Sequence, residues 1–148
     1  QVRRARARGD ARLDELAQLD DGHDGNQGGH AEPLDLDAEK LLVTSRALRL
    51  RREHPEWFVG PRSTYSPVPT TTGNVIAFAR GDDTGEHVVS VATRLPVALE
   101  RRGGWGTNTL SLPPGTWTDR LTGRTAGENA VRLADLLVDL PVALLTRD

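Results

Sequence analysis

The sequence predicts a mainly β fold with an α-helical N-terminal part, in which two helices precede an antiparallel β-sandwich. Apolar residues recur with the period of a helix as far as His54. From Pro61 onward they recur with a period of two, in short runs between glycine and proline turns. Six or seven short strands at this spacing are typical of a sandwich. The length of 148 residues suits one ordinary domain with a helical appendage.

The first helix is predicted within residues 1–19. Leu13, Leu16 and Leu19 form a short apolar patch by which we expect this helix to dock, whereas a glycine and four arginines weaken its first half. Residues 20–36 follow as a predicted mobile insert. Four glycines, four aspartates and a proline in this stretch do not build a packed element.

The strongest helix is predicted over residues 37–54. Asp37 suits the N-cap, and arginines fill the C-terminal half, where cations interact favourably with the helix dipole. His54-Pro55 ends the helix, since the residue before a proline avoids helical angles. A sandwich of about 90 residues buries a modest core, so we expect the broad apolar face of this helix to need a partner outside the chain. That face consists of Leu41, Leu42, Val43, Ala47, Leu48 and Leu50.

Seven short segments are the candidate strands. The clearest two, Val75–Arg80 and Val88–Thr93, flank a turn of glycine and aspartate and predict a hairpin. Pro67 limits the segment Ser63–Val68 to an edge strand, because proline cannot donate to a sheet ladder. The remaining candidates are Ser63–Val68, Thr107–Leu112, Gly115–Asp119, Ala130–Leu133 and Val142–Thr146.

Composition excludes several classes of protein. With no cysteine there is no disulfide framework and no thiolate metal site. A net charge of −2 gives no overall attraction to nucleic acid or anionic lipid. No apolar run reaches the roughly 20 residues that span a bilayer, so we expect neither a nucleic-acid nor a membrane partner. Because the chain begins at Gln1 and holds no methionine, we expect a processed product or a fragment.

No pattern assigns a catalytic residue, a metal ligand or a cofactor. His23 and His30 share the insert with several aspartates, and residues 24–35 loosely resemble a calcium-binding loop. A glycine stands where the third ligand would be, and Pro33 interrupts the exit, so a solvated loop is the favoured interpretation.

The remaining histidines and the N-terminal arginines are each open to a structural interpretation as well as a functional one. His54 and His87 lack a carboxylate or hydroxyl partner at a diagnostic spacing and are predicted to be structural or surface groups. For Arg3–Arg12, a solvated helix face is favoured over a nucleic-acid patch, because no aromatic residue interleaves with the arginines.

The aromatic residues raise the alternative of a sugar-binding platform, which would need exposed rings in a row. Trp57, Tyr65 and Trp105 are its candidates. The competing interpretation places Trp57 and Trp117 in the core, and a core position is favoured for Trp117 and for Trp105.

The junction Arg51–Gly60 (RREHPEWFVG) resembles one found in the α-amylase superfamily, glycoside hydrolase family 13. In that superfamily the last helix of a (β/α)8 barrel leads into a C-terminal antiparallel β-domain. Within it, the chain resembles the C-terminal end of the malto-oligosyltrehalose synthase family. The segments that carry the resemblance are Lys40–Arg52, Val88–Leu95, Gly104–Gly106, Pro113–Gly123 and Leu133–Leu145.

The resemblance implies a domain organisation. Residues 1–19 would be a helix from the end of the catalytic barrel region, and the insert 20–36 would follow it. Residues 37–60 would be the last barrel helix and the junction, and 61–148 the C-terminal antiparallel β-sandwich. The apolar face of helix 37–54 would then pack on a barrel that this chain lacks, and the missing barrel would be its partner.

The resemblance also implies a cytoplasmic isomerase of trehalose biosynthesis. Family members convert the reducing-end α-1,4 bond of malto-oligosaccharides into an α,α-1,1 bond, by a retaining double displacement that uses two carboxylates. Those carboxylates lie in the barrel, so no catalytic residue is carried over, substrate would be bound through the barrel, and no cofactor is implied. The chain alone is predicted to be inactive. The alternative is a stand-alone, non-catalytic β-sandwich that binds α-glucans.

Overall fold

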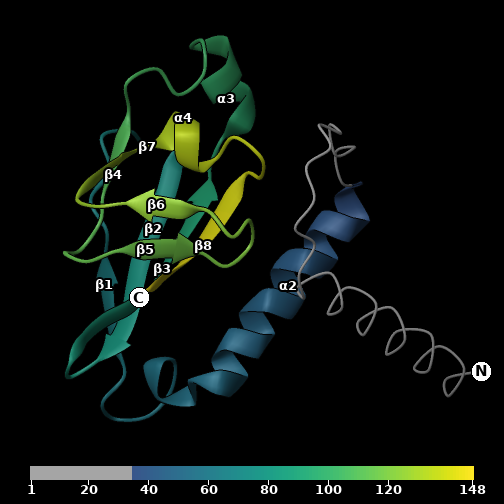
Figure 1. The fold of residues 1–148 in the computed structure, drawn as a ribbon. Helices are drawn as coiled ribbons and strands as arrows, with labels where there is room; N and C mark the ends of the chain where they lie inside the picture. Colours follow the sequence, from purple (N-terminus) through teal and green to yellow (C-terminus); the bar gives the residue numbers. More distant parts are fainter. Residues whose placement is uncertain (1–34) are drawn as a thin grey trace, which may run out of the picture. The chain divides into compact units, whose positions relative to one another are not determined.

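The computed structural model describes residues 35–148. The predicted helix within residues 1–19, and the insert as far as residue 34, lie outside the described residues. Residues 38–148 form one compact unit. In this part of the chain, six strands form an antiparallel sheet in the order β1-β2-β3-β8-β5-β6, and β4 pairs with β7 in a second sheet (Figure 1).

The predicted mainly β, antiparallel character is therefore confirmed, and all seven predicted strand segments contain a strand. Val75–Arg80 and Val88–Thr93 pair as a hairpin, and β1 lies at an edge of the sheet, as Pro67 indicated. The strands are β1 (Thr64–Pro67), β2 (Val75–Asp82), β3 (Gly85–Thr93), β4 (Thr109–Ser111), β5 (Trp117–Asp119), β6 (Thr125–Gly127), β7 (Ala130–Arg132) and β8 (Val142–Arg147).

The two sheets face each other across a cluster that we call the inner core. Alternate residues of β2, Val75, Ala77 and Ala79, point into it, as the period of two requires. The two-stranded sheet contributes Leu110 and Val131, so the arrangement is sandwich-like. The other members are Val68, Val89, Val91, Leu112, Trp117, Leu133, Leu137, Ala143 and Leu145.

The opposite side of the six-stranded sheet, its outer face, carries a second cluster that we call the outer core. Helix α2 (Leu36–Glu53) and the 3₁₀ turn η1 (Pro55–Trp57) contribute to it together with β3 and β8. Its buried members are Leu50, Val88, Leu121, Leu140 and Leu144, and its partly buried members are Leu42, Val43, Ala47, Trp57, Phe58 and Val142.

The position and packing of α2 correct two predictions. The helix begins at Leu36, so Asp37 lies inside its first turn and not at the N-cap. Four of the six predicted apolar residues contact the chain's own β-domain, so most of that face has a partner here, contrary to the expectation from domain size. Leu48 differs, because its side chain is 60% exposed and is not part of the outer core.

Four short elements of the described chain were not predicted. They are η1, α3 (Pro96–Arg101), α4 (Leu133–Leu136) and β6. None is long enough to show a period of its own. Helix α3 begins after Leu95, which adopts a left-handed conformation with φ of 53° and which no sequence rule places there. None of the described helices is long and apolar enough to cross a membrane.

Candidate interaction surface at the helix–hairpin junction

The most specific side-chain geometry lies where η1 meets the β2–β3 hairpin, at a group that we call the junction: His54, Trp57, Asp82, Thr84 and His87. The ring of Trp57 stacks on His54, with centroids 3.7 Å apart and planes 6° apart. It also stacks on His87, at 4.7 Å and 19°. The near-parallel stacking of these three rings holds the end of α2 against the hairpin.

Both histidines of the junction have carboxylate partners. Nε2 of His87 lies 3.1 Å from Oδ1 of Asp82, and Nδ1 of His54 lies 3.4 Å from Oε1 of Glu56. Neither partner stands at a spacing that is diagnostic in the sequence. The hairpin brings residues 82 and 87 together across two strands, so spacing along the chain did not reveal this pair. The prediction that both are structural or surface groups fits their places in the stack.

Asp82 is held ionised by its own turn. Its Oδ1 accepts hydrogen bonds from the Thr84 hydroxyl at 2.6 Å and from the Thr84 backbone N–H at 2.9 Å. These two bonds, with the contribution of His87, lower the pKa of Asp82 from 3.8 to about 2. A carboxylate that bonds to the backbone two residues later is an Asx turn. The sequence signalled this turn through its Asp-Asp-Thr-Gly run, but it gave no sign of the histidine partner.

The glycine before this turn has a specific steric reason. A Cβ at Gly81 would lie 1.9 Å from the carbonyl oxygen of Gly85 on the facing strand. The pairing shifts by one residue between Arg80 and Gly81, and the chains approach closely at that irregularity. Glycine therefore permits the bulge that places Asp82 beside His87.

The buried carboxylate of Asp119 links β5 to β8. This residue was not singled out from the sequence. Its Oδ1 accepts the backbone N–H groups of Leu121 and Leu144, each at 3.1 Å, and its Oδ2 accepts the Thr122 hydroxyl at 2.8 Å. With an exposure of 2%, Asp119 serves as a joint between β5, its turn and β8. It also borders a pocket of about 80 Å³, far below the several hundred Å³ of ordinary ligand sites.

The predicted sugar-binding aromatics are not brought into one row. Trp105 packs against the inner core and Trp57 against the outer core, on opposite sides of the six-stranded sheet. Tyr65 lies on β1 and is 63% exposed. Trp117 is fully buried, and its indole N–H donates to the Pro113 carbonyl at 2.8 Å. The favoured core position of Trp117 is confirmed, whereas Trp105 is only partly buried and packs against the inner core.

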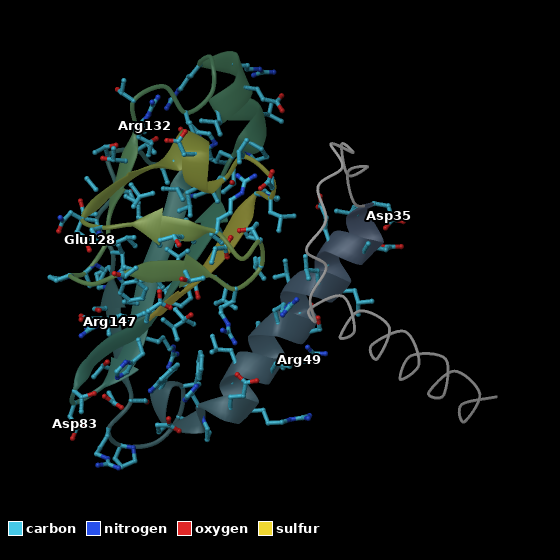
Figure 2. The ribbon with its side chains drawn as sticks, in the orientation of Figure 1. Asp35, Arg49, Asp83, Glu128, Arg132 and Arg147 are labelled. Carbon is cyan, nitrogen blue, oxygen red and sulfur yellow. The ribbon has the colours of Figure 1, made fainter. Side chains whose placement is uncertain are left out.

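The remaining candidate site residues lie outside the described part of the chain, and the described part contains no group of side chains that could bind a metal ion. His23, His30 and Arg3–Arg12 lie outside the described residues. Among residues 35–148, no three histidine, aspartate or glutamate side chains are grouped so that they could hold a metal ion. Charged side chains such as Arg49, Asp83 and Arg132 project outward from the described elements (Figure 2).

The geometry of the junction does not identify a protein family, but known proteins of similar sequence do. Curated proteins named maltooligosyl trehalose synthase, from two strains of Mycobacterium tuberculosis, are 45% identical to this chain over 112 residues. The matched region is 74% of this chain and 14% of each relative. This chain is homologous to the C-terminal portion of maltooligosyl trehalose synthase.

Solved structures agree with this homology. Two structures of maltooligosyltrehalose synthase from Arthrobacter ramosus, one of a single-substitution mutant, match this chain with a TM-score of 0.71 and 38% identity. They cover 93% of this chain, which in turn covers 17% of theirs. No protein-family profile matches the chain. The chain spans less than a fifth of the length of the maltooligosyl trehalose synthases that it matches.

Proposed function

We propose that this chain is the C-terminal domain of an isomerase that converts the reducing-end α-1,4 bond of malto-oligosaccharides into the α,α-1,1 bond of a terminal trehalose unit. The observation that supports the proposal is 45% identity spread over 112 residues, with relatives that carry the name maltooligosyl trehalose synthase. Identity spread over three quarters of a chain is far more specific than one short motif. The cytoplasmic setting and the role in trehalose biosynthesis belong to the same proposal.

In this proposal the chain braces the catalytic barrel and takes no part in the chemistry. Asp82 accepts hydrogen bonds from the backbone N–H and hydroxyl of Thr84 in its own turn. Asp119 accepts them from the backbone N–H of Leu121 and the Thr122 hydroxyl in its turn, and from the backbone N–H of Leu144 on β8. Retaining glycoside chemistry needs a nucleophilic carboxylate and an acid/base carboxylate about 5 Å apart. We assign both to the barrel, which must also keep water from the glycosyl intermediate.

The decisive experiment replaces the matched C-terminal segment of the Arthrobacter ramosus enzyme with this chain. The chimera, the truncated enzyme without the segment and the 148-residue chain are each incubated with maltohexaose, and loss of reducing ends is measured. We expect activity from the chimera and none from the chain alone. Activity of the chain alone, or a folded chimera without activity, would overturn the proposal.

A second candidate function, non-catalytic α-glucan binding, is favoured only by the exposed ring of Tyr65. Its other two predicted aromatics pack on opposite sides of the sheet. Tyrosine and tryptophan fluorescence titrated with maltoheptaose tests it in the 148-residue chain. A saturable change that Tyr65→Ala abolishes would support a binding module, and a flat response would remove this function.

A further inference from the structure

Strand β2 is apolar on both of its faces. Val75, Ala77 and Ala79 enter the inner core, and the residues between them, Ile76 and Phe78, point to the outer face of the sheet. An antiparallel sheet whose second face meets water normally alternates apolar with polar residues, and a strand apolar on both faces is typical of a sheet covered on both sides. The sequence of β2 therefore indicates a cover on its outer face.

Helix α2 does not supply that cover. The sheet residues that it meets in the outer core come from β3 and β8, namely Val88, Val142 and Leu144. Ile76 of β2 remains 51% exposed and its partner across the ladder, Ala92, is exposed as well. We call the apolar residues of this face that lie outside the outer core the outer strip: the exposed Tyr65, Pro67, Ile76 and Ala92 and the half-buried Phe78.

The aromatic end of the outer strip makes ring and cation–π contacts within the domain. The Tyr65 ring lies 5.3 Å from the Phe78 ring, and the Arg80 guanidinium lies 5.7 Å from the Tyr65 centroid. Nη1 of Arg80 donates to the Phe58 carbonyl at 2.9 Å, which fixes the guanidinium against η1. A tyrosine and an arginine held in place before binding are the residue types that dominate the energy of protein interfaces.

We propose that the outer strip docks against the catalytic portion that precedes this segment in the longer maltooligosyl trehalose synthases. The proposal rests on the proposed function and names the surface through which the domain would brace the barrel. This chain covers 14–17% of the relatives, so most of each relative lies outside the matched segment and supplies a body of protein large enough to be the occupant. The chain enters the domain through α2, and α2 packs on the same outer face as the strip.

The absence of cysteine in this chain permits a direct test. Single cysteines are introduced as Ile76→Cys in the outer strip and as Ser111→Cys on β4, the control. Ser111 is exposed on the second sheet, beyond the inner core from the strip. Each variant is made in the 148-residue chain and in the Arthrobacter chimera, and maleimide labelling of each site is followed by peptide mass spectrometry.

In the isolated chain, both cysteines are expected to react quickly because both positions are exposed. In the chimera, labelling at Ile76→Cys is expected to slow by about tenfold or more while Ser111→Cys keeps its rate, since maleimide reaction requires an accessible thiolate. Equal labelling of Ile76→Cys in chain and chimera would overturn the proposal. Slow labelling of Ile76→Cys in the isolated chain would also overturn it, because residues 1–34 or a second copy would then be the occupant.

The readouts separate this inference from the proposed function. An active chimera with an unprotected Ile76→Cys site would leave the function standing and refute the docking surface. A folded, inactive chimera with a protected site would refute the proposed function and leave the docking surface standing. If the chimera fails to fold, the same cysteines are placed at the aligned positions of the Arthrobacter ramosus enzyme itself. Fast labelling at the position aligned with Ile76 would then refute the proposal.

Discussion

Nε2 of His87 lies 3.1 Å from Oδ1 of Asp82, on the opposite strand of the β2–β3 hairpin. His87 also stacks on the Trp57 ring, and its Nε2 lies within hydrogen-bond distance of the Thr84 hydroxyl in the turn. The pair therefore joins the hairpin to Trp57. The end of α2 is thereby attached to the sheet through polar and aromatic contacts as well as through the outer core.

Replacing Asp82 should change the acid stability of the domain. The fold lowers the pKa of Asp82 from 3.8 to about 2, so the ionised carboxylate stabilises the native state above pH 3.8. That contribution is lost as pH falls from 3.8 toward 2. Asp82→Asn should be less stable than wild type at pH 7 and should lose less stability between pH 5 and pH 2. Thermal unfolding followed by circular dichroism measures both, with Asp83→Asn as the control in the same turn. Identical acid profiles for Asp82→Asn and wild type would contradict the assignment.

Leu50 and Leu48 test how α2 is attached. Leu50 is 3% exposed in the outer core, so Leu50→Ala should lower the free energy of unfolding by about 3 kcal/mol through lost burial and a residual cavity. Leu48 is 60% exposed, and Leu48→Ala should change it by less than about 0.5 kcal/mol. Urea unfolding of the two variants makes the comparison. Similar losses from both would mean that α2 does not lie on the sheet as described.

Asp119 is expected to be a structural carboxylate. Asp119→Ala leaves the buried N–H groups of Leu121 and Leu144 without an acceptor and should cost about 3 kcal/mol of unfolding free energy. Asp119→Asn keeps an oxygen for these donors and should cost roughly 1 kcal/mol, from the loss of charge-assisted bonding. Urea unfolding again provides the values. A larger loss for asparagine than for alanine would refute the role of this acceptor.

Gly81 should tolerate no side chain. The Cβ of Gly81→Ala would meet the Gly85 backbone at 1.9 Å, and backbone atoms cannot move aside without breaking the hairpin. We expect a loss of more than about 2 kcal/mol. Gly73→Ala is the matched control, because no atom lies within 4 Å of its added Cβ; it should be neutral within about 0.5 kcal/mol or slightly stabilising. Differential scanning calorimetry of both variants is sufficient. Equal melting temperatures would show that the bulge is not needed.

The predicted strands were found because their alternation reflects a real inner face. Val75, Ala77 and Ala79 follow the pleat. Strand β8 was recognised as a short apolar run, and its residues 143–146 are all buried. Strand β6 was missed because Thr125–Gly127 is too short to show alternation and forms only by pairing with β5. Helix α4 was missed because its four residues continue from β7 without a break in the apolar pattern.

The sequence by itself determined the fold class, the α2 helix and its end at His54-Pro55, and the likeness to one family, because these depend on local periodicity and on residue order. Only the tertiary structure decided which surface α2 covers, that His87 meets Asp82, and that Asp119 joins β5 to β8. These are contacts between residues placed side by side by strand pairing. Their partners are chosen by the register of the sheet, which no short stretch of sequence contains.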